Sequence, residues 1–132
     1  MKVRDLRPSS RWFTVTVKVL DVGEEKTVFS RRDRSRHRVA EALVGDETGT
    51  ILFSLWDEDI DRVREMVGSS ITVRNGYIVL FRGSMRLALG RFGTIEEPVR
   101  EIENVNESVN MSEKRYEMRR SPPRRFGGRR GY

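Results

Sequence analysis

Three aromatic residues, Trp56, Tyr77 and Phe81, have the type and spacing that could carry chemistry in this chain of 132 residues. Trp56 is expected on the face of its strand opposite three apolar residues, and Tyr77 and Phe81 lie four residues apart on one outer face. Large exposed aromatic side chains are unusual on a monomer unless they bind something. Nucleobases suit them, because every base has a π-face on which a ring can stack. The pattern predicts a base-stacking surface; the alternative is that some of these rings pack beneath other parts of the chain.

Arginine is the second signal. The chain has 26 Lys and Arg against 20 Asp and Glu, and only four of the 26 are Lys, which leaves 22 Arg. Arginine stacks on flat rings and binds phosphate through paired N–H groups, so this bias indicates nucleic acid. Two groups are predicted to contact phosphates: Arg31, Arg32, Arg34, Arg36 and Arg38 in the first long loop, and Arg74, Arg82 and Arg86 around the last two strands. The alternative is a solvated charged surface.

Few residues in the sequence are of the types that catalysis or metal binding requires. The chain has no cysteine and a single histidine, His37, which is expected to be a surface or base-contacting residue within the basic loop. The acidic run that begins at Asp57 is explained by the preference of a helix N-terminus for negative charge. No nucleophile–base pair or phosphate-binding loop is evident. We therefore expect a protein without enzymatic activity, cofactor or metal.

The composition divides the chain near Ile102. Residues 103–132 have few large apolar residues and no steady period, which predicts a disordered segment. The last fourteen residues, 119–132, contain six Arg and no acid, so residues 1–118 are formally neutral and the net charge of +6 belongs to this tail. Arg- and Gly-rich tails of this kind are typical of nucleic-acid-binding proteins. We predict a folded domain over 1–102 and a basic tail over 103–132 that contacts nucleic acid or, alternatively, partners or solvent.

The folded part has the pattern of a β-barrel. Alternation of apolar and polar residues, or a buried run between turn signals, predicts strands over 12–22, 38–46, 50–56, 70–81 and 84–90, with an amphipathic helix over 57–67. Five strands with a helix between the third and fourth match an all-β OB-fold barrel. A five-stranded SH3-like barrel is the alternative, although it usually lacks a helix at that point.

The residue pattern over 70–81 also predicts an irregularity within this strand. Its buried face falls on odd positions at Val73 and on even positions at Ile78, and a strand changes parity only where an extra residue is inserted. We predict a β-bulge near Asn75 and Gly76. The bulge turns Tyr77 and the residues that alternate with it to the outer face.

Several segments resemble a known family. The stretch from Glu41 to Ile51, EALVGDETGTI, together with the Trp56 and Tyr77 segments, is similar to archaeal single-OB-fold single-stranded DNA-binding proteins and to the B subunits of the eukaryotic sensor-of-ssDNA complex. The resemblance covers about residues 3–95. It implies that Trp56, Tyr77 and Phe81 stack on bases and that the tail is a disordered Gly/Arg-rich extension.

The chain departs from that family at two points. Ala88 stands where eukaryotic relatives often have a further aromatic residue, so one stacking position is missing. The tail ends in Gly131 and Tyr132 instead of the acidic tip of some archaeal relatives, which weakens the case for recruitment of partners through the tip.

These observations predict a monomeric, sequence-tolerant protein that binds and protects single-stranded DNA during replication, recombination and repair. We expect it in the cytoplasm with the nucleoid, without a membrane segment, and with replication and repair proteins as partners through the tail. An RNA-binding OB-fold protein is one alternative, because stacking does not distinguish RNA from DNA. An adaptor subunit that docks a partner protein through the exposed aromatics is the other.

Overall fold

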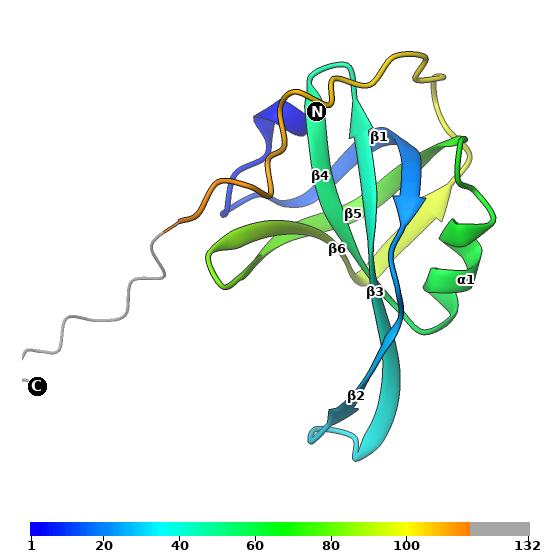
Figure 1. The fold of residues 1–132 in the computed structure, drawn as a ribbon, viewed down its shortest axis with the longest axis vertical. Helices are drawn as coiled ribbons and strands as arrows, with labels where there is room; N and C mark the ends of the chain where they lie inside the picture. The colour runs from blue at the N-terminus through cyan, green and yellow to red at the C-terminus, as the bar shows by residue number, and fades with distance from the viewer. Residues whose placement is uncertain (117–132) are drawn as a thin grey trace, which may run out of the picture.

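The computed structural model describes residues 1–116, and Figure 1 shows its ribbon. The basic segment over 119–132 lies outside the described residues. The elements are a 3-10 turn η1 (Val3–Asp5), the strands β1 (Arg11–Val22), β2 (Lys26–Ser30), β3 (Ser35–Asp46), β4 (Gly49–Trp56), β5 (Ser70–Phe81) and β6 (Ser84–Glu96), and the helix α1 (Glu58–Arg64) between β4 and β5.

Five of these strands form a closed barrel, which confirms the predicted OB fold. The strands are hydrogen-bonded in the order β1-β5-β6-β4-β3, and β1 also pairs with β3 and so closes the ring. Every pairing is antiparallel except β4 with β6, which run parallel at Leu52 and Phe53. The predicted helix lies between the third and fourth barrel strands and contacts the barrel through its buried Ile60 and Val63.

The core is built by the alternation seen in the sequence. On β1, Val15, Val17 and Val19 point inward with at most 1% of each residue exposed. Phe53, on the inner face of β4, is the largest fully buried side chain. Because successive residues on a strand point to opposite faces, these inward positions leave the intervening residues of the same strands for the outer surface.

The fourth barrel strand contains the predicted bulge. The pairing of β5 with β6 shifts register between Arg74 and Gly76, and Asn75 adopts a left-handed backbone with φ of 55°. Ile71 and Ile78 are both buried although they differ in parity. The bulge is therefore confirmed, and it changes which residues in the second half of β5 face the core.

One strand was not predicted. The basic loop expected between the first two strands forms a hairpin instead, in which β2 pairs with an extended β3 from Lys26 opposite Val39 to Ser30 opposite Ser35. Figure 1 shows this hairpin, which we call the arm (residues 26–39), reaching away from the barrel. Most of β2 is exposed on both faces, so it has no apolar alternation to reveal it. The other differences are shifts of boundaries: β3 begins earlier, β6 ends later and α1 is shorter than expected.

A second difference concerns residues 103–116, which we call the strap. The absence of a hydrophobic period predicted no core contacts here, yet Met111 and Tyr116 pack against the core. Ser112 is buried; its hydroxyl donates to the carbonyl of Met85 on β6 at 2.6 Å and accepts from the N–H of Leu52 on β4 at 2.9 Å. The strap thus joins the two parallel strands through one side chain. The division of the chain at residue 102 stays a prediction, because residues 117–132 are not described.

Candidate nucleic-acid interface

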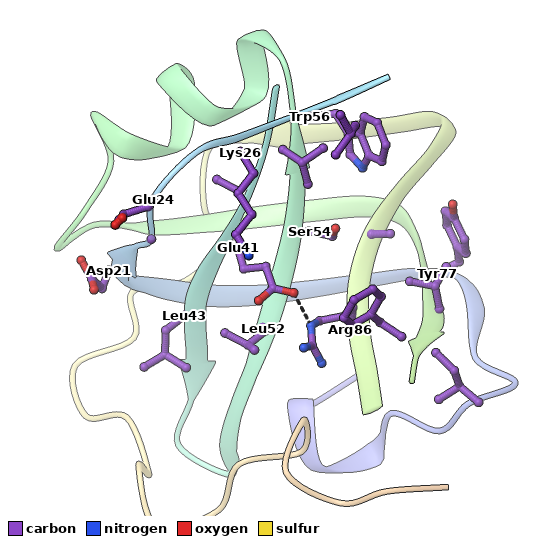
Figure 2. A pocket seen from close by; sticks show the side chains of 18 residues that line it. Asp21, Glu24, Lys26, Glu41, Leu43, Leu52, Ser54, Trp56, Tyr77 and Arg86 are labelled. Carbon is purple, nitrogen blue, oxygen red and sulfur yellow. Dashed lines mark hydrogen bonds and ion pairs between the residues drawn. The ribbon is translucent and has the colours of Figure 1, made fainter. Parts of the chain in front are cut away.

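A groove of about 920 Å³ lies on the outer face of the barrel, across β2, β3, β4, β6 and β5. Figure 2 shows its lining from close by. Apolar and aromatic side chains predominate, and the charged side chains of Glu41 and Arg86 lie among them (Figure 2). The groove is lined by Asp21, Gly23, Glu24, Lys26, Val28, Val39, Ala40, Glu41, Leu43, Leu52, Ser54, Trp56, Tyr77, Val79, Leu80, Phe81, Arg86 and Ala88.

All three predicted stacking residues line this groove, although they come from two different strands. Trp56, at the end of β4, has 48% of its surface exposed and follows Leu52 and Ser54 on the outer face. Tyr77 is half-buried and Phe81 is 53% exposed, both on the part of β5 that follows the bulge. Three rings with accessible faces therefore border one apolar channel, which is the arrangement that unpaired bases require for stacking.

Two arginines lie beside the ring of Phe81. The guanidinium groups of Arg82 and Arg86 lie 5.3 and 5.6 Å from the centre of the Phe81 ring. Arg86 also donates to a carboxylate oxygen of Glu41 at 2.5 Å, the dashed contact in Figure 2, and only 11% of its side chain is exposed. Arg86 is thus fixed against the groove wall, whereas Arg82 stands at the exposed turn between β5 and β6.

The other predicted phosphate-contacting residues divide into two sets. Arg31, Arg32 and Arg34 are exposed at the tip of the arm, and Arg36 is exposed on its β3 side. Arg38 donates to Asp61 on α1 at 2.8 Å, and Arg74 donates to Glu96 at 2.6 Å. Arg38 is therefore held by acids of other segments, whereas the other four arginines of the predicted basic loop are exposed. Arg74 does not line the groove.

His37 connects the tip of the arm to the residues at the end of β4. Its Nδ1 lies 2.8 Å from Asp57, its Nε2 lies 2.8 Å from Asp33 at the arm tip, and its ring meets Trp56 edge-on at 5.8 Å. Asp57 also accepts from the backbone N–H of Arg38 at 3.0 Å, so this carboxylate does more than favour the helix N-terminus. The histidine expected to be a surface residue is thus part of the support of Trp56.

The two carboxylates change the protonation of this histidine. The hydrogen bond with Asp57, followed by the one with Asp33, raises the pKa of His37 above its ordinary value of 6.5. The hydrogen bonds from Ser35 and His37 lower the pKa of Asp33 to about 2. The carboxylate contribution to stability is complete above the ordinary carboxyl pKa and is lost as the pH falls through about 2. The imidazolium contribution is complete below 6.5 and is lost as the pH rises through the raised pKa.

We predict that the pKa of His37 lies above 6.5 and that the arm becomes less firmly held when His37 loses its proton. Neutral imidazole keeps only one N–H donor, so one of the two carboxylate contacts is lost at high pH. An NMR titration of the ring protons measures this directly, because the chain has a single histidine. Asp57→Asn should lower the midpoint, whereas Glu97→Gln, an exposed change on another segment, should leave it unchanged. A wild-type midpoint at or below 6.5 would contradict the bridging geometry.

Sequence reasoning missed three exposed aromatic residues. Trp12, which opens β1, is 61% exposed, and its ring centre lies 6.4 Å from that of Tyr77. Phe29 on the arm and Phe92 on β6 are 62% and 72% exposed. A signal for Trp12 was present, since it shares its parity with Thr14, opposite the buried face of β1.

Two negative observations hold for residues 1–116. No group of three or more His, Cys, Asp or Glu side chains in this part of the chain is arranged to hold a metal ion. None of the helices described for it has the length and apolar character needed to cross a membrane.

The strand order, the parallel pairing of β4 with β6 and the groove on the outer face define an OB-fold protein. The model of the family "Single-stranded DNA binding protein Ssb-like, OB fold" matches residues 6–97, and the chain belongs to this family. The single-stranded DNA-binding protein Ssb of Saccharolobus solfataricus is 30% identical over 96 residues, which cover 73% of this chain and 62% of that protein. The family is one of binding proteins, as its name states.

Other relatives have less informative names or more distant sequences. An uncharacterized protein of Arabidopsis thaliana is 32% identical over 126 residues, covering 89% of this chain and 81% of the relative. The solution structure of a hypothetical protein from the same plant superposes with a TM-score of 0.71 at 32% identity, covering 92% of this chain and 88% of that one. A chain of a replication protein A heterotrimer bound to ssDNA reaches a TM-score of 0.61 at 14% identity, covering 80% of this chain and 27% of that one, a likeness of fold alone.

Proposed function

We propose that this protein binds single-stranded DNA in the groove, without regard to sequence and without enzymatic activity, by stacking bases on Trp56, Tyr77 and Phe81. The observation that carries the proposal is that these three rings, from two strands, border one groove with apolar walls. Stacking contributes roughly 1–3 kcal/mol per base and is similar for all four bases.

We propose that phosphate contacts come first from the arginines that form no ion pair within residues 1–116. Arg82 lies beside Phe81, and the three exposed arginines at the arm tip (Arg31, Arg32 and Arg34) can follow a strand leaving the groove. Arg36 is paired with Phe29 across the arm, on the face turned away from the groove, so we expect a smaller contribution from it. Arg38, Arg74 and Arg86 would have to exchange a carboxylate for a phosphate, so their contribution is expected to be smaller. Such contacts give affinity that falls with salt and carries no base preference.

The finer role is also a proposal. The name of the archaeal relative supports the binding of single-stranded DNA, and we propose that this binding protects single strands during replication, recombination and repair. We further propose a monomer that acts beside the nucleoid and meets replication or repair proteins through its basic tail. The alternatives are RNA binding and an adaptor function, and the titration described next distinguishes them.

The test compares three ligands at physiological salt with residues 1–118, which lack the six arginines of the tail. Paired bases are stacked on each other and leave no face for the groove, so we expect poly-dT to bind at least about 100-fold more tightly than blunt duplex DNA. Tryptophan fluorescence reads the titration. Equal affinity for poly-dT and duplex would contradict the groove proposal. Tighter binding of matched single-stranded RNA would favour the RNA-binding alternative, and no quenching by either polymer would favour the adaptor.

A further inference from the structure

Trp12 extends the line of aromatic rings beyond the groove. Tyr77 borders the groove, and the Trp12 ring lies beside it, with 6.4 Å between ring centres and 40° between planes. The Trp12 ring also lies over Gly90 of β6: a Cβ added at Gly90 would stand 3.0 Å from Cζ3 of Trp12 and 3.5 Å from Cδ1 of Tyr77. Because Tyr77 lines the groove, a Cβ at Gly90 that stands against its ring lies on the same side of the barrel. The Trp12 ring is therefore on the groove face of the barrel.

The backbone at Trp12 is unfavourable for an ordinary folding role. Its φ is 59°, in the left-handed region that non-glycine residues seldom adopt, and the pairing of β1 with β5 shifts register on both sides of Phe13. A strained residue of this kind persists only where its surroundings determine it, and such residues cluster at binding sites. Here the strain holds a large ring 61% exposed to solvent. Burial does not account for the position of this side chain.

The charge around Trp12 selects the occupant. Arg11 precedes it and is exposed opposite Tyr77 in the sheet, and Arg91 follows Gly90 and is also exposed. Arg91 lies 5.7 Å from the centre of the Phe92 ring, so an exposed arginine also accompanies this neighbouring aromatic residue. A polyanion with flat bases matches this combination, since arginine binds phosphate and the rings accept bases. An acidic or purely apolar partner would use only half of these groups.

We propose that Trp12 is a fourth stacking platform, which binds the next base of a single strand whose preceding bases lie on Phe81 and Tyr77. This inference rests on the proposed function, and it assigns the strand a direction of travel across β5 toward β1. It also gives Gly90 a role: a side chain there would displace the Trp12 ring from its place beside Tyr77.

The first test is a series of dT oligonucleotides from about 4 to about 16 nucleotides, spanning the site sizes of single OB folds. For the full chain, Trp12→Ala should leave the shortest bound oligonucleotides unaffected and weaken the longer ones by about 5- to 100-fold. Trp12→Phe keeps a stacking ring and should restore most of that loss. Phe29→Ala is the matched control: Phe29 is equally exposed, but its neighbour Val28 lines the groove, so Phe29 points to the opposite face.

A second measurement does not depend on the stability of Trp12→Ala. The chain has two tryptophans, so Trp56→Phe leaves Trp12 as the only one. Saturating long poly-dT should quench its fluorescence, and an oligonucleotide too short to reach Trp12 should not. Unchanged fluorescence, or an oligonucleotide series in which Trp12→Ala and Phe29→Ala behave like wild type, would overturn the inference.

These outcomes separate the inference from the function on which it rests. If Trp56→Ala weakens binding at every length and Trp12→Ala weakens it at none, the groove binds DNA and the fourth platform is wrong. If wild type binds no oligonucleotide at all, the proposed function itself fails. Loss at long lengths alone for Trp12→Ala supports both.

Discussion

Replacement of Trp56 by alanine is expected to weaken binding of single-stranded DNA by roughly 1–3 kcal/mol, which is about a 5- to 150-fold loss in affinity. The side chain projects from the end of β4 into the groove with about half of its surface in solvent. Its removal takes away one stacking face and leaves no cavity in the core. The free energy of unfolding should therefore stay close to that of wild type.

Two variants make this result specific. Trp56→Phe retains a ring at the same position and should lose much less affinity than alanine. Phe29→Ala removes an exposed ring of the arm that points away from the groove and should bind as wild type does. Normal binding by Trp56→Ala, or unfolding of this variant well below the wild-type temperature, would show that Trp56 is not a stacking platform.

Truncation after Ile102 is expected to lower the free energy of unfolding by at least about 4 kcal/mol relative to residues 1–118, because the strap forms at least four hydrogen bonds with the barrel and each contributes about 1 kcal/mol net. The strap bonds to β4 through Thr50, where the amide donates to Val109 at 2.7 Å and the carbonyl accepts from Met111 at 2.8 Å. The Ser112 hydroxyl links β4 to β6, and Met111 packs on the core. Urea titrations of the two truncated chains measure the difference.

A pair of serine variants isolates the central contact in the full chain. Ser112→Ala leaves the Leu52 amide and the Met85 carbonyl without their partner and should cost about 1–3 kcal/mol. Ser108→Ala, on the same strap but exposed, should cost almost nothing. If residues 1–102 unfold at the same urea concentration as residues 1–118, the strap does not stabilise the barrel and the division predicted at residue 102 is the physical one.

The sequence was informative wherever burial is one-sided. Val15 and Val17 alternate with polar residues because one face of β1 meets the core, and this period predicted the strand. The change of parity between Val73 and Ile78 predicted the bulge before its register shift was observed. The same alternation placed Trp56, Tyr77 and Phe81 outside the core, and the barrel topology brings them to one groove.

What escaped prediction has no such asymmetry. β2 is exposed on both faces, so its pairing with β3 leaves no pattern in the residues. The strap contributes isolated groups, such as the Ser112 hydroxyl, whose partners lie 27 and 60 residues away. The partner of Arg86 is Glu41, which is 45 residues away, and that of Arg38 is Asp61, which is 23 residues away. Charge counts along the chain do not reveal which arginines are already held by acids.

The link that Ser112 makes across the parallel strands has a consequence for how fast the barrel unfolds. β3 and β4 are joined by a short turn and can pair early, whereas β4 and β6 meet only after α1 and β5 are in place. Chains dominated by contacts between distant residues fold slowly, because each loop must be closed before its contact contributes. Ser112 can bridge Leu52 and Met85 only once those two strands are adjacent. We therefore expect its contacts to be absent from the folding transition state, so that Ser112→Ala speeds unfolding and leaves the refolding rate nearly unchanged.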